Sequence, residues 1–206
     1  RFIKVLKDKF NLSDDDLVNE DILKYDINNI KATDVIVFGN LPYNISTQIL
    51  SKFIKVKSWP PFYKKIIFMF QNEVADRILA KVNTANFGRL TVISNFRLVP
   101  VDYFKIKKSC FFPMPKVDSK IIIFKPKLKI DFNIKNIENL ELISRTLFSN
   151  RRKMINKAFF KLFKNPLDIS SKLNLKLSSR PAELSNETFY KITEFYEKEK
   201  KAKISY

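Results

Sequence analysis

The pattern of apolar and polar positions changes character near residue 126. Before that point, short β-branched and aromatic runs end in polar or proline-containing segments, as is typical of strands in a buried sheet. Amphipathic stretches separate these runs, so this part of the chain predicts an α/β domain over residues 1–126. The predicted strands, in order, span 35–38, 64–70, 98–104 and 120–124, and the predicted helices between them span 49–54, 71–82 and 89–96.

After residue 126, helical spacing dominates. Apolar residues recur every three or four positions over 137–147, 154–162 and 189–196, which indicates amphipathic helices. Basic residues crowd the same part of the chain, with the run Arg151, Arg152 and Lys153 at its centre. The sequence therefore predicts a small, basic, all-helical domain over residues 127–206.

Composition and charge narrow the classes of function. The 206 residues hold 39 Lys and Arg against 21 Asp and Glu, a net charge of +18, which indicates a polyanionic partner such as nucleic acid. With no histidine and only Cys110, a zinc site, a histidine-based triad and an intrachain disulfide are excluded, and no metal is expected. No apolar run approaches the roughly 20 residues of a membrane span, so we expect a cytoplasmic monomer without a membrane partner.

The segment from Val35 to Thr47 joins a predicted strand to a polar loop that contains proline. Gly39, one of two glycines, is expected to let the backbone turn tightly, and Pro42 to stiffen the loop. Asn40 and Tyr43 are then left as exposed chemical groups. In open α/β sheets, ligands bind beyond the carboxyl ends of such strands, so this loop is a candidate site.

The loop offers two hydrogen-bond acceptors and an aromatic face. The Asn40 amide oxygen and the Leu41 carbonyl suit an amino group, which has two N–H donors. A planar purine amine delocalises its lone pair into the ring, and acceptors that hold its hydrogens out of the plane would direct that pair toward an electrophile. Tyr43 could stack on an extruded base. From these residues alone, a plain turn with a solvent-facing asparagine is an equal alternative.

The longer string Asn-Leu-Pro-Tyr-Asn-Ile-Ser-Thr at 40–47 closely resembles the signature of the ribosomal RNA adenine N6-dimethyltransferases of the KsgA type. Further segments at 71–78, 87–92, 111–121 and 149–159 are similar to later segments of that family, in the same order. The resemblance implies a Rossmann-like class I methyltransferase sheet followed by a helical domain. It also implies S-adenosylmethionine as methyl donor, small-subunit ribosomal RNA in the 30S particle as substrate, and a link to ribosome biogenesis.

The resemblance also assigns residues. It implies catalytic roles for Asn40, Leu41, Pro42, Tyr43 and Phe111, with Phe111 opposite Tyr43 and Phe112 left to the core. Asp21 and Ile22, after a short predicted strand at 17–18, match the position that holds the adenine of the cofactor, together with Asn40. The loop 105–119 mixes basic and aromatic residues, which suits phosphate contact and base stacking. The predicted RNA-binding residues are Lys107, Lys108, Lys116, Arg151, Arg152, Lys153 and Lys157.

Other functions stay open from the sequence. The chain begins within a helical spacing, and glycine occurs only at Gly39 and Gly88, so the glycine-rich cofactor loop of the family is not in it. We therefore expect a sheet without its N-terminal strands. A non-catalytic rRNA-binding assembly factor, an inactive fragment and a large-subunit rRNA adenine methylase are the alternatives. An adenine DNA methyltransferase is disfavoured by Leu41, where those enzymes usually carry proline.

Overall fold

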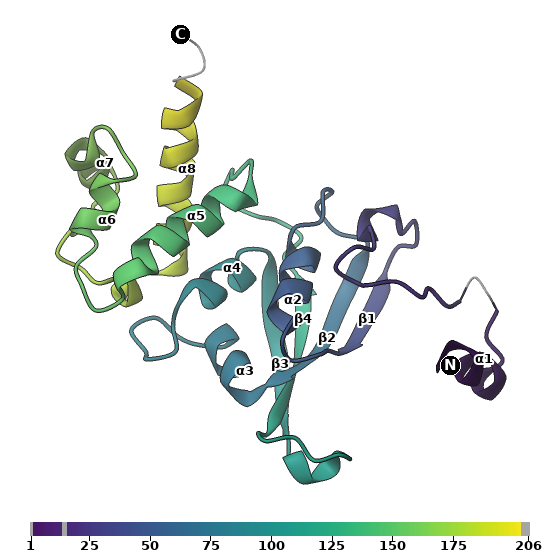
Figure 1. Ribbon diagram of the computed structural model, residues 1–206. Coiled ribbons are helices and arrows are strands. Elements are labelled where there is room, and N and C mark those ends of the chain that lie inside the picture. The colour runs from purple at the N-terminus through teal and green to yellow at the C-terminus, as the bar shows by residue number, and fades with distance from the viewer. Residues whose placement is uncertain (1, 14–15, 203–206) are drawn as a thin grey trace.

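The computed structural model describes residues 2–13 and 16–202, and its centre is a four-stranded mixed sheet (Figure 1). Four of the five predicted strands are present, each somewhat longer than the apolar run that predicted it. Their β-branched and aromatic residues suit a pleated, half-buried surface. The strands are β1 (Val35–Asn40), β2 (Tyr63–Gln71), β3 (Leu98–Ile106) and β4 (Ser119–Pro126).

The topology brings the carboxyl ends of three strands to the same end of the sheet. The strand order is β1-β2-β4-β3, in which β1 is parallel to β2, and β4 is antiparallel to both β2 and β3. It follows that β1, β2 and β3 run in one direction and end on the same side. In register, Asn40 pairs with Met69, while Gln71 and Ile106 both pair with Ser119. Residues far apart in sequence therefore meet at this end of the sheet.

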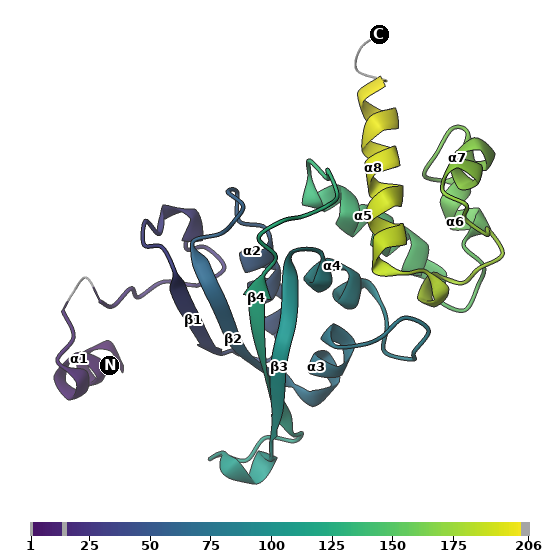
Figure 2. The same cartoon turned by 180° about the vertical axis from the view of Figure 1, so that it is seen from behind.

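Helices cover one face of the sheet. These helices are α2 (Ser46–Ile54), α3 (Asn72–Ile78) and α4 (Arg89–Arg97). Seen from behind, the strands lie in front, and within the described part of the chain no helix covers them (Figure 2). Ile36 and Phe38 point to this open face and are 41% and 72% exposed. The prediction that β1 is a buried strand was thus wrong, because β1 lies at the sheet edge with only one face covered.

Gly39 lies inside β1 and does not form the predicted turn. A Cβ at this position would lie 2.5 Å from Leu41 Cδ2 and 2.8 Å from Phe68 Cδ1. Phe68 is buried in the core, where its ring packs edge-on against Phe53. Glycine is required here by the close approach of a buried ring, and this contact places Asn40 at the strand end.

Gly39→Ala is expected to destabilise the fold by about 1–3 kcal/mol, because the new methyl group overpacks the buried Phe68 ring. Gly88→Ala is the matched control, since its Cβ would meet Arg151 Nη1 at 3.5 Å and the Asn86 carbonyl oxygen at 4.0 Å, both ordinary contacts. That variant should change stability by less than about 1 kcal/mol. Urea unfolding of both variants measures the difference, and equal effects at the two sites would contradict this account.

The N-terminal part holds helix α1 (Phe2–Phe10) and a short 3-10 helix, η1 (Ile27–Asn29). The strand predicted at 17–18 does not form, and residues 20–25 make turns instead. In that segment the carbonyl of Asp21 accepts from the amides of Lys24 and Tyr25, at 2.8 and 2.9 Å. These local hydrogen bonds satisfy the backbone without a neighbouring strand.

After β4 the described chain is helical, as predicted. The remaining elements are η2 (Lys108–Cys110), between β3 and β4, and then α5 (Ile137–Leu147), η3 (Phe148–Asn150), α6 (Asn156–Phe160), α7 (Pro166–Lys172), η4 (Pro181–Glu183) and α8 (Asn186–Ala202). None of the helices in the described ranges is both long and apolar enough to cross a membrane. The division at residue 126 stays a prediction, because the apolar core runs on past it. Tyr190 of α8 packs 5.0 Å from Phe96 of α4 and donates to the Val92 carbonyl at 3.0 Å.

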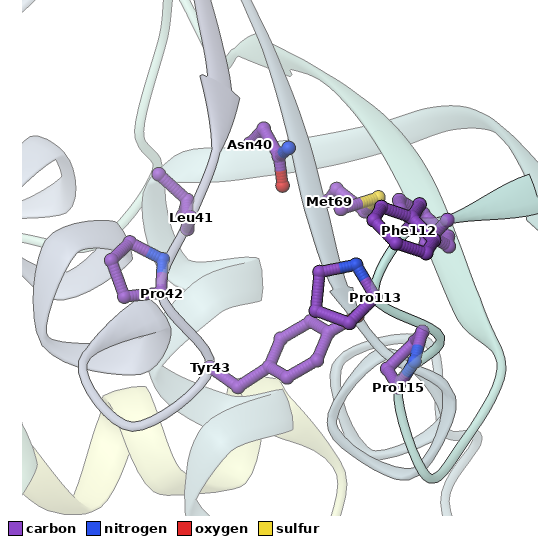
Figure 3. A pocket seen from close by; sticks show the side chains of 9 residues that line it. Asn40, Leu41, Pro42, Tyr43, Met69, Phe112, Pro113 and Pro115 are labelled. Carbon is purple, nitrogen blue, oxygen red and sulfur yellow. The ribbon is translucent and has the colours of Figure 1, made fainter. Parts of the chain in front are cut away.

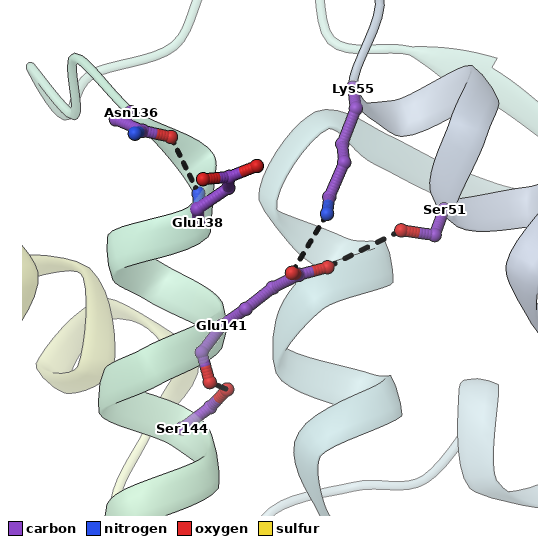
Figure 4. A network of polar contacts seen from close by, with 6 residues as sticks. All are labelled: Ser51, Lys55, Asn136, Glu138, Glu141 and Ser144. Atoms are coloured by element: carbon purple, nitrogen blue, oxygen red, sulfur yellow. Dashed lines mark hydrogen bonds and ion pairs between the residues drawn. The ribbon is translucent and has the colours of Figure 1, made fainter.

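Polar contacts also join the two parts. Glu141 of α5 reaches α2, where Lys55 Nζ lies 2.8 Å from one carboxylate oxygen and Ser51 Oγ donates to the other at 3.3 Å (Figure 4). At the start of the helical part, Lys127 donates from its amide to Arg97 O, and its own carbonyl accepts from Trp59 Nε1 at 2.7 Å. The C-terminal helices are thereby held against the layer of helices that covers one face of the sheet.

Candidate active site

A cavity of about 380 Å³ opens at the end of the sheet where β1 and β2 finish. In Figure 3 the Asn40 side chain points into the space between Leu41 and Phe112, with the Tyr43 ring below. The structure thus brings together the four residues 40–43 and Phe111, which the sequence predicted as one site. The lining residues are Asn40, Leu41, Pro42, Tyr43, Met69, Phe111, Phe112, Pro113 and Pro115.

The turn after β1 uses some of its carbonyls and leaves one unused. Pro42 O accepts from the Ile45 amide at 3.2 Å, and Tyr43 O accepts from Ser46 Oγ at 3.1 Å. Within the described residues, neither the Asn40 side chain nor the Leu41 carbonyl makes a hydrogen bond. The wall of the cavity therefore carries two polar groups without a protein partner, which are free to accept hydrogen bonds from a ligand.

Tyr43 is anchored at its far end. Its hydroxyl lies 2.8 Å from Ser119 Oγ, and Ser119 is the first residue of β4 and has no exposed surface. The sequence analysis missed Ser119, although it lies within the segment 111–121 that carried part of the resemblance. The only signal for it was its position there, since a serine seventy-six residues away gives no local sign of contact with Tyr43.

The opposite wall comes from the loop between β3 and β4. Phe111 is half-buried, while Phe112 is fully exposed at the rim of the cavity, so the assignment of Phe112 to the core was wrong. The loop extends beyond the ends of β3 and β4, where no core is available to cover a second ring. It is closed by Asp118, whose Oδ1 accepts from the Lys108 amide at 2.9 Å and whose carbonyl accepts from the Asn72 amide at 3.0 Å.

A partly buried ion pair lies next to Ser119 in β4. Lys120 is only 6% exposed, and its ammonium group pairs with the carboxylate of Asp76 in α3. Asp76 also accepts from Asn72 Nδ2 at 3.3 Å, and the Lys120 ammonium lies 5.6 Å from the centre of the Tyr103 ring. A buried charge is tolerated only when it is paired in this way. The pair holds α3 against the strand that carries Ser119.

Asp21 and Ile22 lie away from this cavity and do not line it. Asp21 is exposed, and its Oδ1 accepts from the Leu23 amide at 2.9 Å. Ile22 is half-buried against the core cluster. Their proposed contact with a cofactor stays a prediction.

The predicted RNA-binding residues fall into two groups on the surface. Lys107, Lys108 and Lys116 are exposed on the loop that also carries Phe111. The second group lies between α5 and the first turn of α6, where Arg152 and Lys153 precede α6 and Lys157 belongs to it, and all three are exposed. Arg151 differs from its neighbours, because its guanidinium donates to the carbonyls of Phe87 and of Thr84 and lies 6.0 Å from the Phe148 ring.

Arg151→Ala is expected to lower the free energy of unfolding by about 1–3 kcal/mol, because two carbonyls lose a charged donor. Arg152→Ala, at the exposed neighbouring position, should change stability by less than about 0.5 kcal/mol and weaken RNA binding instead. Urea unfolding together with an RNA titration separates the two effects. A stable Arg151→Ala variant with weakened RNA binding would place Arg151 among the RNA contacts.

Comparison with known proteins identifies the family. The model of the family described as ribosomal RNA adenine dimethylase matches residues 1–198. The chain belongs to the ribosomal RNA adenine dimethylase family. This confirms both the family and the enzyme class predicted from the sequence, an S-adenosylmethionine-dependent rRNA methyltransferase.

Curated members of the ribosomal RNA adenine dimethylase family are similar along most of the chain. The small-subunit ribosomal RNA methyltransferase A of Pelagibacter ubique is 40% identical over 193 residues, which are 94% of this chain and 73% of that protein. The protein of the same name from Borreliella burgdorferi is 34% identical over 197 residues, 94% of this chain and 66% of the relative. That of Bartonella tribocorum is 40% identical over 119 residues, 58% of this chain and 42% of the relative.

Two solved structures share the fold of this chain. A dimethyladenosine transferase from Plasmodium falciparum superposes with a TM-score of 0.73 at 24% identity, and covers 96% of this chain and 78% of its own. The 23S rRNA methyltransferase ErmE superposes with a TM-score of 0.63 at 19% identity over the same shares of the two chains. The mixed α/β fold of this chain is therefore similar to that of a dimethyladenosine transferase and of a 23S rRNA methyltransferase.

Proposed function

We propose that this protein transfers methyl groups from S-adenosylmethionine to the N6 amine of adenosines in small-subunit ribosomal RNA, twice per base, during 30S biogenesis. The observation that carries the proposal is the cavity at the end of β1, where two unused acceptors stand beside an anchored aromatic ring. The names and the 34–40% identities of the relatives support the small subunit as the source of the substrate. We further propose that the sheet is of the Rossmann-like class I methyltransferase type, which the TM-score of 0.73 supports.

The acceptors would prepare the amine for reaction. The Asn40 amide oxygen and the Leu41 carbonyl would take the two N–H donors of an adenine amine and draw them out of the ring plane. The nitrogen lone pair would then point away from the ring. Tyr43 and Phe111, on the two loops that line the cavity, would hold the extruded base between their rings. Positioning of this kind supplies most of the rate, so no strong general base is required.

The chain's own residues fit a methyl donor on chemical grounds. When bound, S-adenosylmethionine supplies an electrophilic methyl carbon on a sulfonium. Asp21, Ile22 and Asn40 would hold it. Asp21 uses only Oδ1 within the described chain, so Oδ2 can accept from an adenine amino group, and the Asn40 carboxamide is unpaired there. Ile22 offers a half-buried apolar side chain beside Asp21.

The substrate RNA would cross two basic surfaces. The lysines on the Phe111 loop would neutralise phosphates next to the extruded base, and the basic segment between α5 and α6 would contact RNA farther away. In this arrangement residues 127–206 act as the RNA-binding part and residues 1–126 as the catalytic part. A single chain would suffice, since the proposed residues all belong to one molecule.

A paired assay tests the proposal. The protein is incubated with unmethylated 30S subunits and radiolabelled S-adenosylmethionine, and binding to the same subunits is measured on filters. Transfer of two methyl groups per modified adenosine supports the proposal. Binding without transfer would contradict it and favour a non-catalytic assembly factor. Transfer to 50S subunits in preference to 30S subunits would favour the large-subunit methylase alternative.

A further inference from the structure

We propose that Ser119 is a positioning residue, which holds the Tyr43 ring through its hydroxyl and so ties the two walls of the base-binding cavity together. The inference rests on the proposed function, because it assigns a role to a residue beside that cavity. Ser119 does not line the cavity and is not expected to contact the base.

The hydrogen bond acts on the long axis of the ring. Tyr43 is attached to the backbone at Cβ, and at the other end its hydroxyl lies 2.8 Å from Ser119 Oγ. With both ends held, the ring can only rotate about the line that joins them. Tyr43 is half-buried and Ser119 has no exposed surface, so water competes poorly for this hydrogen bond.

Ser119 is a rigid anchor because of its place in the sheet. It is paired with Gln71 of β2 on one side and with Ile106 of β3 on the other. Its neighbours are also fixed, because Lys120 is buried in an ion pair with Asp76 and Asp118 closes the loop through two hydrogen bonds. The backbone that carries this hydroxyl cannot move without disturbing three strands.

This anchor connects two loops that are distant in sequence. Tyr43 belongs to the turn after β1, whereas Ser119 ends the loop that carries Phe111. The hydrogen bond between Tyr43 and Ser119 therefore sets the position of the Tyr43 ring relative to the loop that carries Phe111. A base can stack on both rings only if the two planes are held at a suitable separation. Ser119 would maintain that separation without touching RNA.

Loss of either hydroxyl should weaken base stacking by the same factor. The test uses the full chain and two RNA hairpins, which differ only in having an unpaired adenosine or an abasic site at one loop position. The dissociation constant of the abasic hairpin divided by that of the adenosine hairpin reports the contribution of the base to binding. Contacts to the RNA backbone are the same in both hairpins and cancel in this ratio. We expect Ser119→Ala and Tyr43→Phe each to reduce this ratio by about 2- to 10-fold, and the double variant to reduce it no further.

The controls separate positioning from folding and from catalysis. Ser109→Ala removes an exposed serine of the same loop and should leave the ratio unchanged. Urea unfolding shows whether the Ser119→Ala variant is folded under the conditions of the binding assay. Additive effects of the two variants, or an unchanged ratio in Ser119→Ala, would overturn the inference. A wild-type ratio near one would overturn it together with the base clamp. If the wild-type protein binds the adenosine hairpin more tightly than the abasic hairpin but transfers no methyl group, only the proposed catalysis is contradicted.

Discussion

Asn40→Ala is expected to abolish methyl transfer, a loss of at least about 10²- to 10³-fold in kcat, while RNA binding stays nearly intact. The reason lies in the geometry of the site. The Asn40 carboxamide has no hydrogen-bonding partner within the described chain, so its removal disturbs no internal network. Its proposed contacts are with the amine at the moment of transfer and with the methyl donor, and their loss affects transfer more than RNA binding.

Two matched variants sharpen this prediction. Asn44→Ala alters an exposed asparagine of the same turn, outside the cavity, and should keep full activity. Asn40→Asp keeps an acceptor oxygen but adds a charge, and should retain more transfer than Asn40→Ala if acceptance by this oxygen is what matters. Methyl incorporation and filter binding are measured on the same preparations. Full activity of Asn40→Ala would refute the acceptor mechanism.

The affinity for RNA is expected to fall steeply with salt, by about 10³-fold between 50 and 200 mM, if six exposed basic residues each neutralise a phosphate. The expectation follows from their number and exposure, since no described acidic side chain is paired with any of them. Arg151 is not counted, because its guanidinium is committed to backbone carbonyls. The six residues are Lys107, Lys108, Lys116, Arg152, Lys153 and Lys157.

Charge-removal variants test which residues contribute to the salt dependence. The pair Lys107→Gln and Lys108→Gln should reduce the slope of log K against log salt by about two, one for each lost phosphate contact. Lys31→Gln with Lys64→Gln is the matched control, since both lysines are exposed at the opposite end of the β1–β2 pair from the cavity. An equal loss of slope in both pairs would indicate binding by overall charge alone.

The two predictions separate the parts of the proposed mechanism. The first concerns a single polar group at the reacting atom and leaves binding intact, whereas the second concerns long-range charge and leaves the chemistry of the bound base intact. A protein that shows this salt dependence but transfers no methyl group even with Asn40 in place would bind RNA without catalysing transfer. This result would favour the assembly-factor alternative.

Local sequence determined the elements and the candidate loop. The apolar runs predicted the four strands of the sheet, and the helical spacings after residue 126 predicted α5, α6 and α8, because the periodicity of burial is written into the order of residues. The short helix α7 was not predicted. The string at 40–47 predicted a turn that presents Asn40, Leu41 and Tyr43 together, since they are neighbours in the chain, and its amine-binding role stays a prediction. The resemblance to a family added Phe111, which no local pattern could have joined to Tyr43.

The tertiary structure alone decided which distant residues meet. The hydrogen bond between Tyr43 and Ser119, the reach of Arg151 to the loop at 84–87 and the contact of Gly39 with the Phe68 ring each join segments that are remote in sequence. The exposure of Ile36 and Phe112 likewise depends on whether another element covers them, and sequence patterns cannot report on that. The sequence thus determined the chemistry of the site and its family, whereas the packing of the sheet determined how that chemistry is held.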